Sequence, residues 1–422
     1  MARNRVIYQS QALFIAPTST GAQIARGGTS GVAGDLAPLN ADDIVAGTTL
    51  LKKLDRVQSC NFSFTINRQD INEFGKLARL DSIVMESPTV GLDFNYYVTD
   101  GLNERLLGFN ITGGAGDTST SNGAQAVSGL LADLEGNNYY ILTVQEGEDV
   151  VGTASSTPPA NSNTVVAIGN GFISEYSFEA SVGAIPTASV TVEGFNIKAD
   201  AQEGNAAGVI TGLSPAIDIT ASPAVKLSDA KEFQTAYGLS GAFTTGSSTV
   251  AALRPGDIVL TLPQTSDGLS DLYGAGSAHI QSFSFTLPLS RTILQRLGNT
   301  FGFARVVDVP INMDVTISAI VSELTDANIF DNLCSATKRN MQIALKDCNS
   351  SQMLWFGISG AIFQSESYSQ NLGDNQTVDL TYTVQIGGGN DTENGLFISG
   401  SYTADNIVKN FFKLGTAKTN II

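Results

Sequence analysis

The sequence predicts a mainly β protein with two tandem antiparallel domains, each a sandwich or barrel with one flanking α-helix and long loops. Three observations predict this class. The chain has 422 residues, about twice the length of a common single domain. It contains 43 Gly but only 23 Lys and Arg together, and long Ala/Glu/Lys/Leu runs are missing, which is typical of β proteins with many turns. The third observation is an internal duplication.

The duplication is clearest in one ungapped alignment, which we call the first block. In it, Val57–Val98 aligns with Ile280–Val321 in a single register. Apolar residues match apolar residues through two different periodicities. The aligned residues include Phe62, Phe64, Arg68, Ile71, Phe74 and Gly75 in the first copy and Phe285, Leu287, Arg291, Leu294, Leu297 and Gly298 in the second.

A second block aligns Phe172–Val192 with Ile362–Tyr382. The two copies of this block lie closer together in the sequence than those of the first block. The first copy must therefore carry a longer insertion, which we place at residues 101–138, a stretch rich in Gly, Ser, Thr and Asn. We expect a first domain over residues 1–205, including this insertion, and a second domain over residues 206–422.

In both copies, the first block is expected to consist of a strand, then a helix and then a further strand. Val57–Ile66 alternates apolar and polar residues, which predicts a half-buried strand. Asn67 has the character of an N-cap, with Asp70 at the third helical position, so an amphipathic helix is expected over Arg68–Leu80. Ser290 takes the cap position in the second copy. The expected apolar stripe consists of Ile71, Phe74 and Leu77 in the first copy and of Ile293, Leu294 and Leu297 in the second.

The rest of each copy is expected to form antiparallel strands joined by tight turns. The expected strands are Thr89–Val98, Tyr139–Val144, Phe172–Val182 and Ala188–Phe195 in the first copy and Asn312–Val321 and Met341–Leu345 in the second. Asp257–Pro263 is the candidate counterpart of Gln11–Pro17. Gly183–Pro186 and Leu372–Asn375 hold the Gly, Pro and Asn residues that favour tight reversals. Trp355 lies in an apolar run and is expected in the core.

The charge of the chain narrows its partners. The formal net charge is −17, and the pI is about 4.4. Lys and Arg drive the binding of phosphate groups, so a chain this acidic is a poor candidate for gripping DNA or anionic lipid. The charge fits a surface along which DNA slides without sticking. On composition alone, the simpler interpretation is that the charge only aids solubility.

We expect no catalytic, cofactor-binding or metal-binding residues, and no enzymatic activity. The three cysteines are Cys60, Cys334 and Cys348. Their odd number and the absence of a CxxC motif predict buried free thiols. His279 is the only histidine, which excludes any mechanism that needs two. Gly113–Asp117 and Gly387–Asp391 resemble calcium turns, but single copies supply too few oxygen ligands, so both are expected to be loops.

No segment has the pattern of a signal peptide or a membrane span. Val6–Pro17 is apolar in part, but Gln9, Ser10 and Gln11 interrupt it. We therefore expect a protein that is not exported through a signal peptide and that has no membrane partner.

Three segments resemble bacteriophage tail tube proteins, also called major tail proteins. Val6–Pro17 is similar to the first strand of these proteins, and Arg56–Leu80 is similar to a stretch found in phage tail proteins. Gly169–Phe195 carries the serine-rich strand, the Gly-x-x-Pro turn and the following strand that are typical of tail tube domains. These are patterns of packing and not catalytic signatures, so the resemblance concerns a structural protein.

The resemblance implies a ring. Tail tube domains are small β-sandwiches or barrels that join their sheets side by side, and six domains normally make one ring. Two tail-tube-like domains in one chain imply a homotrimer with pseudo-sixfold symmetry, although a hexamer stays open. Stacked rings would enclose the channel through which the phage genome is delivered, without specific DNA binding. The implied location is the tail of the virion, after assembly in the cytoplasm of the bacterial host.

The resemblance also implies partners and a contact between rings. The partners would be other copies of the chain, the baseplate, terminator and tape measure proteins, and a sheath if the tail contracts. In tail tubes a long loop reaches the next ring, and the insertion at residues 101–138 is the candidate here. The candidate residues of this inter-ring loop are Gly113, Asp117, Thr118, Ser121 and Asn122.

Other classes of protein remain as alternatives. Another β-rich virion component, such as a baseplate, terminator or decoration protein, would share the composition but would not polymerise into a tube. A surface adhesin would require an export signal, which the sequence does not show. The sequence leaves open whether the tail contracts, which host the phage infects and which acidic residues line the channel.

Overall fold

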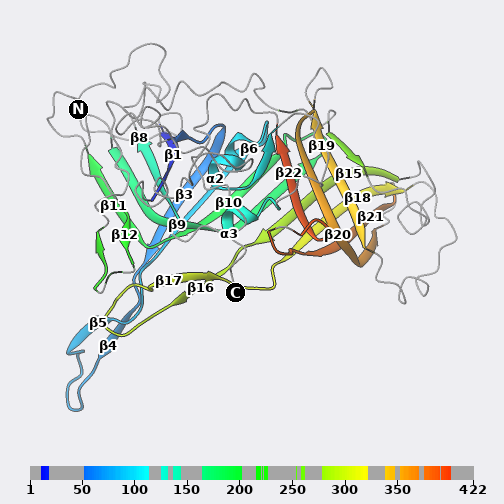
Figure 1. Ribbon diagram of the computed structural model, residues 1–422. Coiled ribbons are helices and arrows are strands. Elements are labelled where there is room, and N and C mark those ends of the chain that lie inside the picture. The colour runs from blue at the N-terminus through cyan, green and yellow to red at the C-terminus, as the bar shows by residue number, and fades with distance from the viewer. Residues whose placement is uncertain are drawn as a thin grey trace, which may run out of the picture.

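The computed structural model describes residues 11–18, 52–113, 125–131, 136–143, 164–201, 215–219, 221, 223–226, 253, 258–261, 278–321, 338–346, 352–369, 375–389 and 391–400. Nearly all of its elements are antiparallel strands, so the expected mainly β class is confirmed (Figure 1). None of the helices within these ranges is long and apolar enough to cross a bilayer.

The elements follow one another in two similar series. The first is β1 (Gln11–Pro17), β2 (Lys52–Lys53), β3 (Val57–Thr65), β4 (Arg68–Ile71), β5 (Asp81–Val84), β6 (Thr89–Tyr97), α2 (Leu102–Leu107), β7 (Ile111–Gly113), α3 (Ser128–Leu131), β8 (Asn137–Thr143), β9 (Thr164–Ser181), β10 (Thr187–Gly194) and β11 (Asn196–Ala201). The second is β12 (Ile217–Asp218), β13 (Val225–Lys226), β14 (Ile258–Thr261), β15 (Ala278–Pro288), β16 (Arg291–Leu294), β17 (Ala304–Val307), β18 (Asn312–Val321), β19 (Arg339–Lys346), β20 (Gln352–Ser369), β21 (Thr377–Gln385) and β22 (Gly395–Gly400). Each strand expected from the sequence overlaps an observed one.

The two series repeat one strand topology. The register of the first block carries β3, β4, β5 and β6 onto β15, β16, β17 and β18, and that of the second block carries β9 and β10 onto β20 and β21. The partners repeat as well, since β10 pairs with β6 and β9 as β21 pairs with β18 and β20. The expected domain boundary at residues 205 and 206 lies outside the described residues and stays a prediction.

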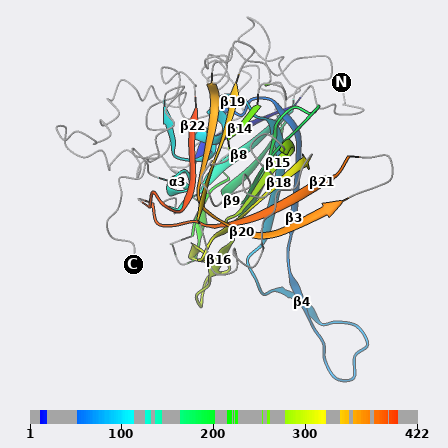
Figure 2. The ribbon, with the colours of Figure 1, turned by 90° about the vertical axis from the view of Figure 1, so that its right-hand side faces the viewer.

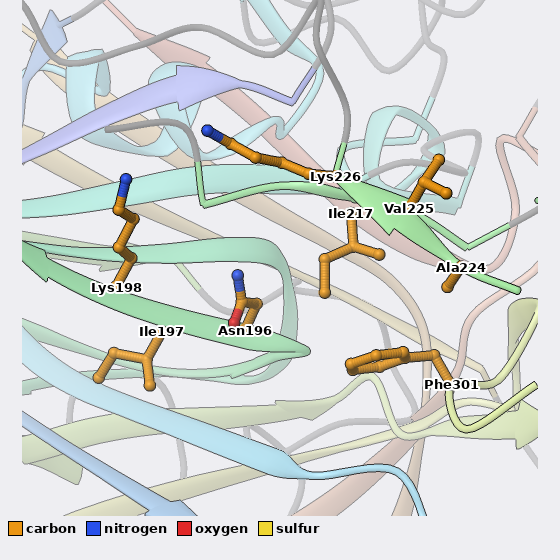
Figure 3. A pocket seen from close by; sticks show the side chains of 8 residues that line it. All are labelled: Asn196, Ile197, Lys198, Ile217, Ala224, Val225, Lys226 and Phe301. Atoms are coloured by element: carbon orange, nitrogen blue, oxygen red, sulfur yellow. The ribbon is translucent and has the colours of Figure 1, made fainter. Parts of the chain in front are cut away.

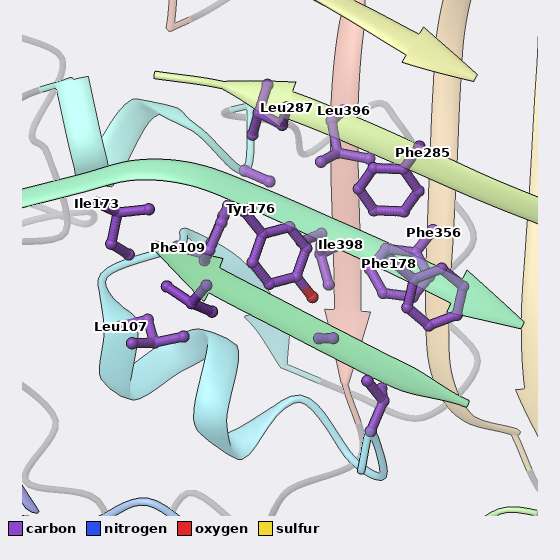
Figure 4. Close-up of a cluster of buried hydrophobic side chains, with 14 of the residues drawn as sticks. Leu107, Phe109, Ile173, Tyr176, Phe178, Phe285, Leu287, Phe356, Leu396 and Ile398 are labelled. Carbon is purple, nitrogen blue, oxygen red and sulfur yellow. The ribbon is translucent and has the colours of Figure 1, made fainter. Parts of the chain in front are cut away.

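Each copy has two layers that share one long strand. The first half of β9 pairs with β8 and β11, and its second half pairs with β10. In the second copy, β20 likewise pairs first with β19 and β22 and then with β21. The core lies between the layers, where Tyr176, Phe178, Phe285 and Phe356 pack together (Figure 4). Trp355 is buried, as expected.

The expected amphipathic helix over Arg68–Leu80 is wrong. The structure places an antiparallel hairpin there, β4–β5, and the equivalent segment of the second copy forms the hairpin β16–β17. Its apolar residues have no core to cover, because Phe74 and Leu77 are fully exposed. Gly75 has a φ of 95°, in the left-handed region that a helix interior does not use. The helical spacing of Ile71, Phe74 and Leu77 therefore does not mark a buried helix face.

The described helices lie elsewhere than expected. Both α2 and α3 belong to the insertion at residues 101–138, and no helix occurs in the described part of residues 206–422. The helix expected after Ser290 in the second copy is also wrong, because β16 and β17 occupy that segment. Gly101 and Gly108 bound α2 with positive φ values of 86° and 105°.

Candidate assembly surface

The two copies join through a strand pair inside the chain. The second half of β9 pairs antiparallel with β15, from Ser181 opposite Ser282 to Glu175 opposite Pro288. This internal joint makes one continuous sheet in the order β20-β21-β18-β15-β9-β10-β6-β3. The chain therefore already shows how one copy attaches to the next.

Aromatic side chains seal the core side of the internal joint. The rings of Phe178 and Phe285 are stacked with centroids 5.5 Å apart and an interplanar angle of 26°. Phe285 is 1% exposed, and Leu287 and Tyr176 beside it are buried completely. Each large side chain buried in this way contributes about 1.5–3 kcal/mol.

The two ends of the continuous sheet are unpaired among the described residues. At one end β3 pairs only with β6, and at the other end the second half of β20 pairs only with β21. In the registers of the two blocks, β3 is the counterpart of β15, and β20 is the counterpart of β9. The two free edges are thus equivalent to the two strands of the internal joint, and they lie at opposite ends of the continuous sheet.

Large apolar side chains lie exposed along both free edges. On β3, Phe62 is 46% and Phe64 is 61% exposed, and on β20 Tyr368 is 45% exposed. Their counterparts in the internal joint are the buried Phe285, Leu287 and Phe178. A long unpaired edge with exposed aromatic residues is an aggregation hazard unless a partner covers it.

The strands of the continuous sheet carry acids and hydroxyls on their outward face but no lysine or arginine. Neither residue type occurs in β3, β6, β10, β15, β18 or β21, nor in the halves of β9 and β20 that join this sheet. Hydroxyl groups hold two of the outward carboxylates, since Ser318 donates to Asp379 at 2.5 Å and Thr383 donates to Asp314 at 3.2 Å. The outward carboxylates are those of Asp93, Glu175, Glu179, Glu193, Asp314 and Asp379.

Part of the insertion connects the two copies. Strand β7 pairs in parallel with β22, and Gly113 lies opposite Gly400. The side-chain amide of Gln125 donates to the backbone carbonyls of Asp391 and Asn394 in the second copy. Of the candidate inter-ring residues, the structure places Gly113 in this connection. Asp117, Thr118, Ser121 and Asn122 lie outside the described residues, so their role stays a prediction.

The core of the first copy contains a buried carboxyl group. Glu104 of α2 accepts hydrogen bonds from the hydroxyls of Tyr96, at 2.9 Å, and Tyr176, at 3.3 Å. Burial raises its pKa to about 7, although both tyrosine hydrogen bonds favour the charged form. The three side chains are buried in the core (Tyr176 in Figure 4). The two hydrogen bonds connect α2 to β6 and β9 within the core.

The thiol of Cys60 is half-buried and free. Burial, and then the charge of Asp93, raise its pKa to about 12, which keeps the thiol protonated and unreactive at neutral pH. The other two cysteines, Cys334 and Cys348, lie outside the described residues. His279 is exposed at the start of β15, and the described part of the chain contains no cluster of His, Cys, Asp or Glu that could hold a metal ion.

A pocket of about 350 Å³ lies between β11, the β12–β13 hairpin and Phe301 (Figure 3). Its lining is Asn196, Ile197, Lys198, Ile217, Ala224, Val225, Lys226 and Phe301. It combines Asn196 and two lysine side chains with apolar residues, and its lining contains no carboxylate, histidine, serine or cysteine. This lining supplies no catalytic constellation.

No protein-family model matches this chain, and no curated protein matches it either. Among the surfaces of the described residues, the two free sheet edges have a paired counterpart inside the same chain, which is the joint of β9 with β15.

Proposed function

We propose that this chain is the subunit of a ring-forming tube of the phage tail type, and not an enzyme. The observation that supports this most strongly is the internal joint between β9 and β15. The continuous sheet ends in β3 and β20, which are the counterparts of β15 and β9 and which each have one unpaired edge among the described residues. A second chain could therefore attach to the first as the second half of the chain attaches to the first half.

The internal register gives the register of the proposed contact. In the joint, Phe285 lies opposite Phe178, and their counterparts in the two blocks are Phe62 and Tyr368. Phe62 of one chain would therefore lie opposite Tyr368 of the neighbouring chain, and Ser63 would lie opposite Ser367. Both aromatic rings would change from half-exposed to buried, with about 1.5–3 kcal/mol gained for each. The free backbone groups of the two edges would pair at the same time.

The proposed contact between chains is directional. Each chain offers a β3 edge to one neighbour and a β20 edge to the other, so the interface is heterologous. Heterologous contacts of this kind form rings when the rotation closes. The resemblance to tail tube proteins supplies the number: six repeats, and therefore three chains with pseudo-sixfold symmetry.

The outward face of the continuous sheet is the proposed wall of the channel. Its carboxylates would repel the phosphates of a passing genome, except for Glu193, which faces the guanidinium of Arg305 at 3.7 Å. The strands themselves carry no lysine or arginine to hold phosphates. The proposed location is the phage virion. The proposed partners are further copies, other tail proteins and DNA that passes without specific binding.

The tips of the hairpins offer a contact between rings in addition to the insertion at residues 101–138. Phe74 and Leu77 at the tip of β4–β5 and Leu297 at the tip of β16–β17 are fully exposed. Both views show β4–β5 extending away from the sheet (Figures 1 and 2). Exposed apolar tips of this kind are typical of contacts with another protein surface.

Electron microscopy of the purified chain, with its mass in solution from light scattering, tests the proposal. Hollow tubes, or closed rings of three chains with six lobes, are expected. A chain that stays monomeric at high concentration would contradict it. That outcome would favour another β-rich virion component or a surface-binding protein, in which a different partner covers the two edges.

A further inference from the structure

The second hairpin, β16–β17, is docked on the first copy. Ile293 and Phe301 pack against a small cluster of Phe172, Phe195 and Ile219. Phe301 and Phe195 meet edge to face, with ring centroids 6.4 Å apart. The hairpin follows β15 after two residues, Leu289 and Ser290, so the docking accompanies the internal joint.

Two arginines fix the base of this hairpin. The guanidinium of Arg305 lies 4.0 Å from the ring centroid of Phe195 and donates at 2.8 Å to the backbone carbonyl of Glu193. Its charge faces the carboxylate of Glu193 at 3.7 Å. Arg291 lies 4.8 Å from the ring centroid of Phe172 and donates at 2.8 Å to the carbonyl of Leu130. The hairpin thus covers the end of the β9 and β10 surface.

Within the described part of the chain, no hairpin covers the equivalent surface of the second copy. Phe172 corresponds to Ile362 in the second block, and the exposure rises from 3% at Phe172 to 37% at Ile362. Glu193 corresponds in the same register to Thr383, near the end of β21. The surface of β20 and β21 that a hairpin would cover is therefore present and open.

The first hairpin, β4–β5, has no such partner among the described residues. Its side-chain hydrogen bonds stay within the segment: Arg79 donates to Asp70, and Asn67 donates to Glu86. Arg68 is the counterpart of Arg291, and Ser82 is the counterpart of Arg305. The hydroxyl of Ser82 is shielded from solvent and has no hydrogen-bond partner.

We propose that the base of β4–β5 docks on the β20–β21 surface of a neighbouring chain, with Arg68 over Ile362 and Ser82 beside Thr383 of that chain. This inference rests on the proposed ring, because pairing of β3 with β20 would bring the two surfaces together. The linker from β3 to β4, Ile66 and Asn67, is as long as the linker from β15 to β16, so the hairpin leaves the joint in the same way.

The two docking sites differ in chemistry on both sides. The site within the chain pairs Arg305 with Glu193, and the site between chains pairs Ser82 with Thr383. On the Thr383 surface, a hairpin carrying Arg305 would lose its contact with Glu193 and would face Asp314, whose carboxylate accepts a hydrogen bond from Thr383 at 3.2 Å. The two docking sites therefore differ by the exchange of Arg305 and Glu193 for Ser82 and Thr383.

Cross-linking of engineered cysteines tests the docking. In a chain whose three native cysteines are replaced by serine, S82C and T383C are combined and treated with a short bismaleimide under assembly conditions. The expected result is a shift of most chains to covalent dimers and trimers on a denaturing gel. A mixture of single S82C and single T383C chains should give dimers only. S82C combined with Lys198→Cys, on the β11 strand, is the matched control and should stay monomeric.

The outcomes separate the docking from the ring. Tubes or rings that form normally but leave S82C/T383C monomeric would overturn the docking and leave the proposed function standing. Equal cross-linking of the S82C/K198C control would overturn it as well. If the unmodified chain forms neither rings nor tubes, both proposals are overturned, because no neighbouring chain would then be present for the hairpin to dock on.

Discussion

At the scale of single residues, the buried carboxyl of Glu104 makes stability depend on pH. Its pKa rises from 4.5 to about 7 in the folded chain, because burial disfavours the charge. The folded state thus holds the proton more tightly than the unfolded state. This stabilises the fold below pH 4.5, and the contribution is lost as the pH rises towards 7. A shift of this size corresponds to about 3 kcal/mol.

Replacement of Glu104 by glutamine should remove this dependence. The amide oxygen of Gln can still accept from Tyr96 and Tyr176, so the packing is kept. In urea unfolding at pH 5 and pH 8, we expect the wild-type chain to lose more stability towards pH 8 than Glu104→Gln does. The difference between the two proteins isolates this group from the other carboxylates. Equal pH dependence in both would show that Glu104 is ionised in the fold.

The duplication provides a matched pair of phenylalanines. Phe62 and Phe285 occupy equivalent positions, but Phe62 is 46% exposed and Phe285 is 1% exposed. Phe285→Ala should destabilise the monomer by about 3–5 kcal/mol, because it opens a cavity in the core. Phe62→Ala should cost less than about 1 kcal/mol in the monomer and yet weaken assembly. Unfolding curves and light scattering measure the two effects separately. Normal assembly of Phe62→Ala would argue against β3 as an interface strand.

At the scale of elements, the sequence predicted strands well and the connecting segments poorly. Alternation located β6, β10 and β18 to within two residues at each end, because each has one face in the core. It also located β3, but the expected half-buried face of β3 is wrong, because no residue of this strand is buried. The helix over Arg68–Leu80 failed because its apolar residues serve an exposed hairpin. Periodicity reports where apolar residues recur, and it does not report whether the chain itself covers them.

The candidate surface was only partly predictable for the same reason. The two aligned blocks could be read from the sequence, and they identify the equivalent strands. The pairing of β9 with β15 could not be read, because register and neighbours depend on contacts distant in the sequence. Only this pairing shows that β3 and β20 are complementary edges.

The hairpin tip gives a prediction at this scale. Phe74→Ser combined with Leu77→Ser should leave the monomer fold unchanged, because both side chains are fully exposed. If the tips join rings, the variant should form rings that no longer stack, as seen by electron microscopy. Leu297→Ser, at the tip of the second hairpin, should weaken stacking in the same direction. Tubes of normal length from the double variant would assign stacking to another segment, such as residues 101–138.

At the scale of the whole molecule, the two copies share a topology and divide the charges. The first copy carries Asp93, Glu175, Glu179 and Glu193 on the outward face, where the second copy has Thr316, Ser365, Ser369 and Thr383. In the same comparison, Asp314 and Asp379 of the second copy correspond to Gly91 and Ser189 of the first. None of these acids is therefore repeated at an equivalent position. In a ring of alternating copies, this pattern spreads negative charge around the wall.

Charge reversal on this face provides the test of the channel wall. Asp93→Lys combined with Asp379→Lys places cations on strands that carry no lysine or arginine, so the wall should retain DNA by attraction to its phosphates. When tubes assemble in the presence of short duplex DNA and are sedimented, the wild-type chain should carry little DNA and the variant much more. Because the attraction is electrostatic, rising salt should release the DNA from the variant. Asp308→Lys combined with Glu393→Lys, at exposed positions after β17 and before β22, changes the net charge equally and is the control. Equal DNA retention by this control would place the effect in net charge and argue that the acidic face does not line a channel.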